Sequence, residues 1–240
     1  MKKVYASWEK RNLGVETWEL EIEPQDSVDE YGKECLAVDA QYLVIKVPAG
    51  CADWGFFLQE NGFKYVETLI SFSRSTEIPE LSKLQGRFLP LLSYSVMNNE
   101  DVEMLYREIN TNMFATDRIS LDPFFTKELS NRRYVGLLKD EFERGAIPYN
   151  IEYKGERVGF FVLRERENKV IYGSLGGMYP DVTSIGIGFS LGYLEIVAAN
   201  SLGGKKILAA VSTNNKGSMA VTTQFGYSVD KMSAIYVKHL

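Results

Sequence analysis

The stretch that decides the fold is Pro180-Asp-Val-Thr-Ser-Ile-Gly-Ile-Gly-Phe189, in which Gly186 and Gly188 lead directly into an apolar segment. A strand-like segment, residues 168–178, precedes it. A strand, a glycine-rich turn and a helix start, in this order, direct several backbone N–H groups at one point, which suits a pyrophosphate. We therefore expect a ligand site here; a tight strand-to-helix turn that binds nothing is the alternative.

The segments around this turn alternate between helical and strand patterns. Apolar residues at three- and four-residue spacing predict a helix that ends at Gly203-Gly204. From residue 90 on, we expect the order β-α-α-β-β-β-α-β-α-β. Its main segments are helices at 98–112, 126–144 and 215–225, an antiparallel meander at 148–153, 157–164 and 169–178, and strands at 205–212 and 226–238.

The N-terminal part shows a shorter pattern of the same kind, with a strand at 41–47, a helix at 49–61 closed by Gly62, and a strand at 64–73. Residues 74–88 lack periodicity and have the composition of a linker. We expect an N-terminal domain at 1–75, a linker at 76–89 and a second domain at 90–240.

A weak internal repeat relates the two parts. Leu58–Phe63 and Thr222–Tyr227 both give a helix end, a glycine, an aromatic residue and then a strand of about ten residues. If the match is genuine, the N-terminal domain is a partial copy of the C-terminal one. Chance similarity is the alternative, because helix–glycine–strand junctions are common.

Composition excludes several classes of protein. A hydrophobic content of 45% supports a well-buried core, and a formal net charge of −5 argues against nucleic acid as a partner. No segment has the pattern of a signal peptide or the length of a membrane span, so we expect a cytoplasmic protein. Cys35 and Cys51 form no disulfide framework and neither is near the single histidine, His239, so no metal site is expected.

The residues around the glycine turn resemble the acetyl-CoA-binding core of the GNAT superfamily of N-acetyltransferases, over residues 90–240. Members of that family have a proline that is followed three residues later by Arg or Gln, and then by the pattern x-x-Gly-x-Gly or x-x-Gly-x-Ala. About thirty residues after this pattern, an Asn begins a helix that ends in Gly-Phe or Gly-Tyr. The matching positions are Pro180, Thr183, Gly186, Gly188, Asn215, Gly226 and Tyr227. The resemblance implies an α+β fold, a central and mostly antiparallel twisted sheet with flanking helices, preceded by a smaller partial GNAT-like domain.

The N-terminal half narrows the resemblance. Trp8-Glu-Lys-Arg-Asn-Leu-Gly14-Val15 is similar to the start of the dTDP-fucosamine acetyltransferase branch, and Leu58–Ser71 and Arg118–Arg133 are similar in character to its other segments. The resemblance implies transfer of an acetyl group from acetyl-CoA to a primary amine, by direct attack in a ternary complex. The amine it implies belongs to a nucleotide-linked amino sugar.

For the acetyl-CoA site, the resemblance implies a mostly backbone-built pocket. The amides of Ile185, Gly186, Ile187, Gly188 and Phe189 would face the pyrophosphate. The strand Leu175–Met178, including Gly177, would pair with pantetheine, and the Met178 N–H would stabilise the oxyanion. Asn215 either caps its helix only or also contacts acetyl-CoA.

Two positions depart from the family pattern. Thr183 replaces the usual Arg or Gln, although its hydroxyl can still donate one hydrogen bond. Thr222 stands where many members have the tyrosine that protonates the coenzyme A thiolate. Tyr227 and Tyr236 are the candidates to replace it, with packing on the last strand as their alternative role. Otherwise the thiolate departs unassisted, or the activity is lost.

The acceptor site is expected at the Met113–Phe125 segment, which joins two helices over the end of the sheet. Arg118 and Asp122 would contact a nucleotide diphosphate or an amine, and Phe124 or Phe125 would stack on a base or sugar. Their alternative roles are a solvated ion pair and a small satellite core. A GNAT-fold protein that binds without catalysis, or one that acetylates a different amine, competes with this interpretation. The sequence leaves monomer and homodimer open.

Overall fold

The computed structural model describes residues 1–180 and 186–240, so the predicted ligand contacts of Thr183 and Ile185 lie outside the described residues. The N-terminal part contains four strands and three helices. In chain order they are β1 (Lys2–Tyr5), α1 (Ser7–Leu13), β2 (Thr17–Glu21), α2 (Val28–Leu36), β3 (Tyr42–Pro48), α3 (Ala52–Glu60) and β4 (Lys64–Ser75). The predicted strand, helix and strand at 41–73 are confirmed as β3, α3 and β4.

The segment predicted as a linker carries a short helix, α4 (Lys83–Gly86), and a 3₁₀ turn, η1 (Leu89–Leu91). Ser82 and Gln85 form a capping box at the start of α4, which explains a helix in a segment without apolar periodicity.

The C-terminal part has the predicted element order, with one additional short helix, α6. Its elements are β5 (Leu92–Val96), α5 (Asn99–Ile109), α6 (Arg118–Leu121), α7 (Lys127–Glu143), β6 (Ile147–Tyr153), β7 (Glu156–Arg166), η2 (Glu167–Lys169), β8 (Val170–Met178), α8 (Phe189–Ser201), β9 (Lys206–Ser212), α9 (Lys216–Gln224) and β10 (Ser228–His239). Helices α5, α7 and α9 each start at a polar side chain that caps them: Asn98 accepts from the Asp101 N–H, Thr126 from the Leu129 N–H and Asn215 from the Ser218 N–H.

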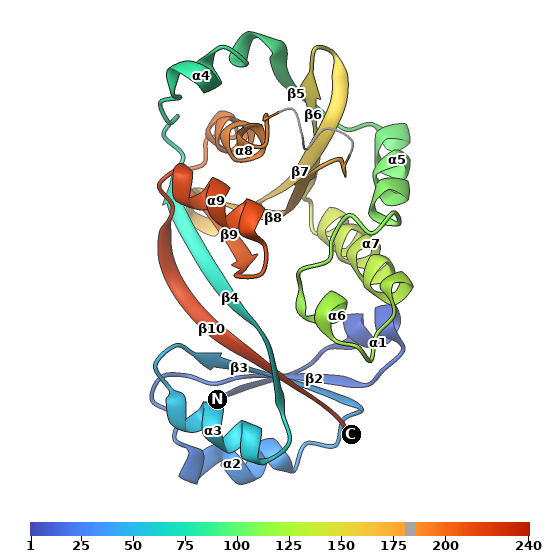
Figure 1. Ribbon diagram of the computed structural model, residues 1–240, viewed down its shortest axis with the longest axis vertical. Coiled ribbons are helices and arrows are strands. Elements are labelled where there is room, and N and C mark those ends of the chain that lie inside the picture. The colour runs from blue at the N-terminus through green and yellow to red at the C-terminus, as the bar shows by residue number, and fades with distance from the viewer. Residues whose placement is uncertain (181–185) are drawn as a thin grey trace.

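The described strands form one continuous mixed sheet in the order β1-β2-β3-β10-β4-β9-β8-β7-β6-β5. The two longest strands, β4 and β10, are exchanged between its halves. Strand β10 follows α9 but lies between β3 and β4, whereas β4 follows α3 but lies between β10 and β9. They run side by side from one half of the molecule into the other (Figure 1).

Both exchanged strands leave their helix in the same way. Gly62 (φ +84°) precedes Phe63 and β4, and Gly226 (φ +68°) precedes Tyr227 and β10. Glycine is favoured at these helix ends because a side chain strains the left-handed conformation. The division into two domains stays a prediction, since the sheet runs through both parts.

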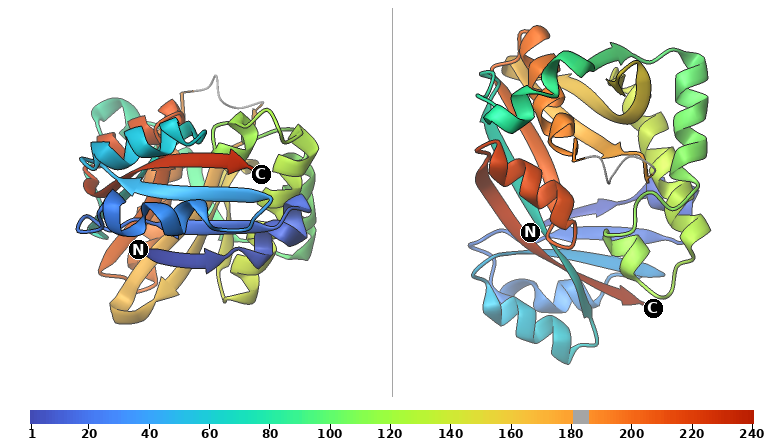
Figure 2. Two further views of the ribbon diagram at one scale, coloured as in Figure 1. Left: turned by 90° about the horizontal axis from the view of Figure 1, so that it is seen from below. Right: turned by 45° about the horizontal axis from the view of Figure 1, so that its top comes forward.

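Alternation along β7 separates two helical layers around the C-terminal half of the sheet. Phe160 and Val162 pack with α5 and α7, whereas Phe161 and Leu163 pack with α8. Successive strand residues point to opposite faces, so one apolar strand supplies both cores. Figures 1 and 2 show α5 and α7 on one side of these strands and α8 and α9 on the other. The predicted α+β fold, a sheet with flanking helices, is confirmed.

Candidate functional site

The central feature of the site is a parallel strand pair that opens partway along. Strand β8 pairs with β9 only from Val170 to Gly173, opposite Lys206 to Ala209. On its other side, β8 stays paired with β7, but with one extra residue, Ser174, at a register shift. Such a bulge bends its strand and disrupts the ladder locally. Residues 174–178 therefore present a backbone edge that no described strand on the β9 side covers.

A cavity of about 320 Å³ lies at this opening. Leu191 on α8 and Val221 on α9 line it from one layer, and Tyr134 on α7 lines it from the other. Gly173 and Ala209, the last paired residues of β8 and β9, also contribute. Since both helical layers supply its walls, we infer that the cavity connects the two faces of the sheet where β8 and β9 part.

Helix α8 begins beside this edge without a side-chain cap from the described residues. Gly186 has φ +80°, and a Cβ built on Gly186 or on Gly188 would meet no described atom within 4 Å. The side chains of Ile187 and Phe189 are buried in the core. No described atom therefore crowds Gly186 or Gly188, and N–H groups at a helix N-terminus suit a phosphate.

The corresponding place in the N-terminal half is closed. Strand β2 pairs with β3 along its whole length, and the Ile22 N–H continues the pairing by donating to the Lys46 carbonyl. In the turn before α2, the Asp26 carboxylate accepts from the Glu23 N–H and pairs with the N-terminal ammonium at 2.7 Å. This half has no splayed strand pair for a pantetheine arm, and a carboxylate occupies its turn.

The predicted acetyl-CoA contacts occupy different places around the cavity. Gly176 and Asn215 line it, whereas Gly177 and Met178 follow on β8 toward α8 and are not among its lining residues. A Cβ on Gly177 would lie 2.6 Å from the Met113 Cε, so only glycine fits there without movement of Met113. Asn215 caps α9 through the Ser218 N–H at 3.0 Å and also lines the cavity, so its two proposed roles are compatible.

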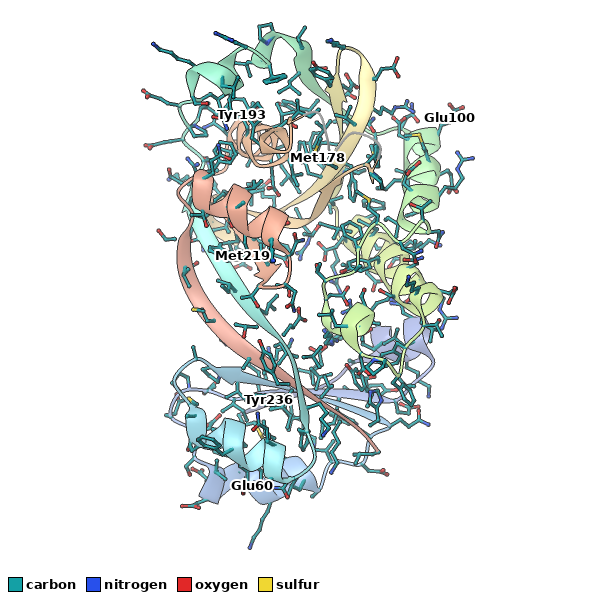
Figure 3. All side chains as sticks on the ribbon, viewed as in Figure 1. Glu60, Glu100, Met178, Tyr193, Met219 and Tyr236 are labelled. Carbon is teal, nitrogen blue, oxygen red and sulfur yellow. The ribbon has the colours of Figure 1, made fainter. Side chains whose placement is uncertain are left out.

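The structure separates the two tyrosines proposed as the acid. Tyr236 packs in the core of the N-terminal half with Trp54 and Leu58, and Figure 3 shows it far from Met178. Tyr227 is buried in the core beneath α8, where burial and then the Glu195 carboxylate raise its pKa well above the ordinary value. A phenol with so high a pKa is a poor proton donor to a thiolate. The Thr222 hydroxyl lines the cavity but is committed to the carbonyls of Ser218 and Met219, each at 3.0 Å.

Glu195, which the sequence analysis did not single out, lines the cavity beside Gly173. Its Oε1 lies 2.1 Å from the position of a Cβ built on Gly173. Burial raises the pKa of Glu195 to about 7. A sequence signal exists, because Glu195 is the single charged residue of helix α8, FSLGYLEIVAANS, whose other residues are largely buried.

The predicted acceptor residue Arg118 is committed to an ion-pair cluster. It contacts Glu9 at 2.6 Å and Glu19 at 2.7 Å, and Arg133 contacts Glu9 at 2.8 Å. Burial alone would raise the pKa of Glu19, but Arg118 and Lys46 lower it to about 2. These contacts fasten α1 and β2 to α6 and α7. Arg118 still lines the cavity, although its charge is already matched.

The other two predicted acceptor residues lie elsewhere. The Asp122 carboxylate contacts the His239 Nε2 at 2.7 Å and lines a separate open depression near the end of β10. Phe125 is buried and packs edge-on against Tyr42. The structure therefore brings Arg118 to the cavity but leaves Asp122 and Phe125 outside its lining.

Two further searches of the described residues are negative. Residues 1–180 and 186–240 contain no group of three or more His, Cys, Asp or Glu side chains that could hold a metal ion. Within the same residues, no helix is both long and apolar enough to cross a membrane.

Several solved structures with a similar fold are named as GNAT proteins. A GCN5-related N-acetyltransferase from Sphaerobacter thermophilus aligns with 82% of this chain and 59% of its own, at 13% identity and a TM-score of 0.57. A tandem GNAT protein from the clavulanic acid biosynthesis pathway aligns with 92% of this chain and 74% of its own, at 12% identity and a TM-score of 0.53. The chain has the GNAT fold.

A conserved protein of unknown function from Staphylococcus epidermidis is also similar, with 93% of this chain and 84% of that one aligned, 12% identity and a TM-score of 0.63. No family model matches the chain, and no curated protein matches it in sequence. At these identities the likeness establishes the fold, and the chemistry must be argued from the site.

Proposed function

We propose that this protein is an acetyl-CoA-dependent N-acetyltransferase that acts on a small primary amine by direct transfer in a ternary complex. The observation that carries the proposal is the opening between β8 and β9, with a cavity where the strands part. Beside it lies the start of α8, which follows Gly186 and Gly188 and has no side-chain cap from the described part of the chain. An uncovered strand edge suits the amides of a pantetheine arm, and an open helix start suits a pyrophosphate.

In this proposal the chain's backbone holds the acyl donor. The N–H groups at the start of α8 bind the pyrophosphate, and Gly188 allows its close approach because no Cβ intervenes. The edge of residues 174–178 pairs with pantetheine. We place the oxyanion donor among the backbone N–H groups of residues 174–176, which line the cavity, in preference to the Met178 N–H, which lies farther along β8.

Glu195 is the proposed acid for the departing thiolate. Its carboxyl lines the cavity where the strands part, and a pKa of about 7 leaves a large share of the groups protonated at neutral pH. It supplies what Thr222 cannot, since a threonine hydroxyl is a far weaker acid.

The nature of the acceptor is the least specified part of the proposal. A nucleotide-linked amino sugar, as in the dTDP-fucosamine branch, needs cationic groups for its diphosphate. The two arginines that line the cavity, Arg118 and Arg133, are paired with Glu9. This pairing favours a small amine without phosphate groups, and we retain the amino-sugar nucleotide as the narrower hypothesis.

A second candidate function is a GNAT-fold protein that binds acetyl-CoA without transferring the acetyl group. The observation that favours it is the committed Thr222 hydroxyl together with the raised pKa of Tyr227, since neither group suits protonation of a thiolate.

Two measurements on the intact protein distinguish these functions. Calorimetry with acetyl-CoA tests the site, and the release of free thiol from acetyl-CoA tests transfer, with glucosamine, putrescine, tyramine and a dTDP-amino sugar as acceptors. Saturable binding with amine-dependent thiol release supports the acetyltransferase. Binding without release by any amine supports the second candidate, and no binding overturns both.

A further inference from the structure

We propose that Glu67, on the strand that the N-terminal half contributes to the C-terminal sheet, binds the ammonium group of the acceptor amine and accepts its proton. The inference rests on the proposed acetyltransferase function and specifies its acceptor site.

The position of Glu67 follows from a bulge in β4. Opposite β4, Ile235 of β10 pairs with Glu67, and the next residue, Tyr236, pairs with Tyr65, so Val66 is an extra residue in β4. A bulge of this kind changes the direction of the neighbouring side chains. Glu67 thereby faces α6 and lines the cavity, together with Leu69 of the same strand.

Glu67 is a buried carboxylate with one oxygen in use. It is 5% exposed, and its Oε1 accepts a hydrogen bond from the Arg118 N–H at 3.0 Å. Its Oε2 is buried and has no donor within hydrogen-bond distance among the described residues, although the Ser212 hydroxyl is near enough to lower the pKa of the carboxyl. An unpaired buried carboxylate oxygen is costly, and a ligand that donates a hydrogen bond removes that cost. An alkylammonium supplies both donors and the opposite charge.

The charged groups around Glu67 are already engaged with other partners, so Glu67 is the carboxylate that can bind a cation on this side of the sheet. The Arg118 guanidinium is paired with Glu9 and Glu19. The Asp117 carboxylate accepts from the N–H groups of Ile119 and Ser120, which begin α6. The charged and titratable groups packed around Glu67 are Asp117 and Arg118 at α6, Arg133 and Tyr134 on α7, and Glu9 and Glu19 of the cluster.

Burial raises the pKa of Glu67 above its ordinary value, although the Ser212 hydroxyl and Arg118 oppose the rise. A base is most effective when its pKa lies near the working pH, so this environment suits general-base catalysis. Glu67 and Glu195 reach the cavity from different layers of helices: Glu67 accepts a hydrogen bond from the backbone N–H of Arg118 on α6, whereas Glu195 is part of α8. One carboxyl can thus serve the acceptor and the other the leaving group.

The proposed step balances in atoms and charge. The substrate ammonium transfers one proton to the Glu67 carboxylate, and the resulting neutral nitrogen attacks the thioester carbonyl carbon. A C–N bond forms and the C–S bond breaks, with the electron pair of that bond leaving on sulfur. The sulfur takes a proton from Glu195 or from water, and the attached nitrogen loses one of its two protons to solvent and keeps the other as the amide N–H.

A structural consequence is that the acceptor site is incomplete without the N-terminal half. Glu67 and Leu69 reach the cavity only because β4 lies between β9 and β10. The ligand class that these residues favour is a small cationic amine, because the Glu67 Oε2 lacks a donor among the described residues and both arginines are ion-paired with Glu9, although the buried Arg118 Nε also lacks a hydrogen-bond partner there.

The test compares Glu67→Gln with wild type in the full chain. Glutamine can still accept the Arg118 N–H, so α6 keeps its anchor while the charge and the basic oxygen are removed. The matched control is Glu60→Gln, an exposed carboxyl at the far end of the molecule (Figure 3). Each protein is assayed for thiol release with glucosamine, putrescine and tyramine from pH 5.5 to 9.5, and for acetyl-CoA affinity by calorimetry.

We expect Glu67→Gln to lower kcat/KM for the amine by about 10²- to 10⁴-fold at neutral pH, with a smaller loss at high pH, where more free amine is present. Acetyl-CoA affinity should stay within about twofold of wild type, as in Glu60→Gln. Amine-dependent chemical-shift changes in the complex with coenzyme A, which has no acetyl group to transfer, supply a second measurement. Wild type should show saturable shifts with putrescine and none with 1,4-butanediol. Glu67→Gln should show no saturable shifts with either compound.

The outcomes distinguish failure of the acetyltransferase function from failure of the role of Glu67. Failure of wild type to bind acetyl-CoA overturns the proposed function itself. Intact acetyl-CoA binding and turnover, with an unchanged pH profile in Glu67→Gln, overturn only the role of Glu67 and leave it as an anchor for α6. Wild type that binds acetyl-CoA but shows neither turnover nor saturable amine shifts likewise overturns the acceptor assignment.

Discussion

The half-buried side chain of Glu195 gives the sharpest quantitative prediction. Its pKa is raised from 4.5 to about 7, so the folded protein holds this proton more tightly than the unfolded chain does. The resulting stabilisation is fully present below pH 4.5 and is lost as the pH rises through about 7. Glu195→Gln replaces the carboxyl with a neutral group of similar shape and should remove this pH dependence.

The size of the effect follows from the pKa values. A rise from 4.5 to about 7 corresponds to about 3 kcal/mol of unfolding free energy between the two limits. The side chain keeps partial contact with the cavity, so we take about 1 to 3 kcal/mol as the expected range. At pH 8 the variant should be more stable than wild type by this amount, and near pH 4.5 the two should be equal.

Urea unfolding at pH 5, 6.5 and 8 measures the difference directly, because the midpoint and slope give the unfolding free energy at each pH. Glu165→Gln, which changes an exposed carboxyl on β7, is the control and should give parallel curves with wild type. Parallel curves for Glu195→Gln as well would show that its carboxyl is well solvated, and our argument for its role as an acid would fail.

Three further predictions concern the ion pairs, the donor site and the exchanged strands. Arg118→Ala should cost about 1.5 to 3 kcal/mol in urea unfolding, because Glu9 and Glu19 each lose one charged partner and keep the other, Arg133 and Lys46 respectively. The exposed Arg107→Ala should change stability by under about 0.5 kcal/mol, and equal small losses would contradict the cluster's role. Gly188→Ala should weaken acetyl-CoA binding by about tenfold or more in calorimetry, because its Cβ would stand where the phosphate approaches. It should not lower stability, since the Cβ meets no described atom within 4 Å. Gly86→Ala, whose Cβ also meets no described atom, should change neither acetyl-CoA affinity nor stability. Residues 77–240 expressed alone should not fold cooperatively by circular dichroism and heat, because the place of β4 between β9 and β10 is left empty; a cooperative transition would refute this dependence.

The candidate site was predictable in part. The glycine turn, the uncapped helix start and Asn215 as a cap were accessible because each depends on a short stretch of chain. Glu195 could have been found as a lone charge in an apolar helix. Glu67 could not, because its place depends on a bulge against β10 and on a contact with Arg118, 51 residues away.

The roles proposed for Arg118, Asp122 and Tyr236 show the same limit. A charged or aromatic residue in a loop or strand looks alike in sequence whether it faces a ligand or its own protein. Arg118 meets Glu9 and Glu19 from the other half of the chain, and Tyr236 is carried by β10 into the N-terminal core. Both outcomes depend on partners that no local pattern encodes.

The sequence by itself determined the order of helices and strands, their caps and the glycine turn, because capping, glycine conformation and apolar periodicity act over a few residues. Only the tertiary structure decided which strands are neighbours. Strand periodicity fixes which side chains share a face, but it does not specify the partner strand, so the exchange of β4 and β10 is absent from any local signal. That exchange places an N-terminal carboxylate in the C-terminal cavity, and the parting of β8 and β9 forms the cavity itself.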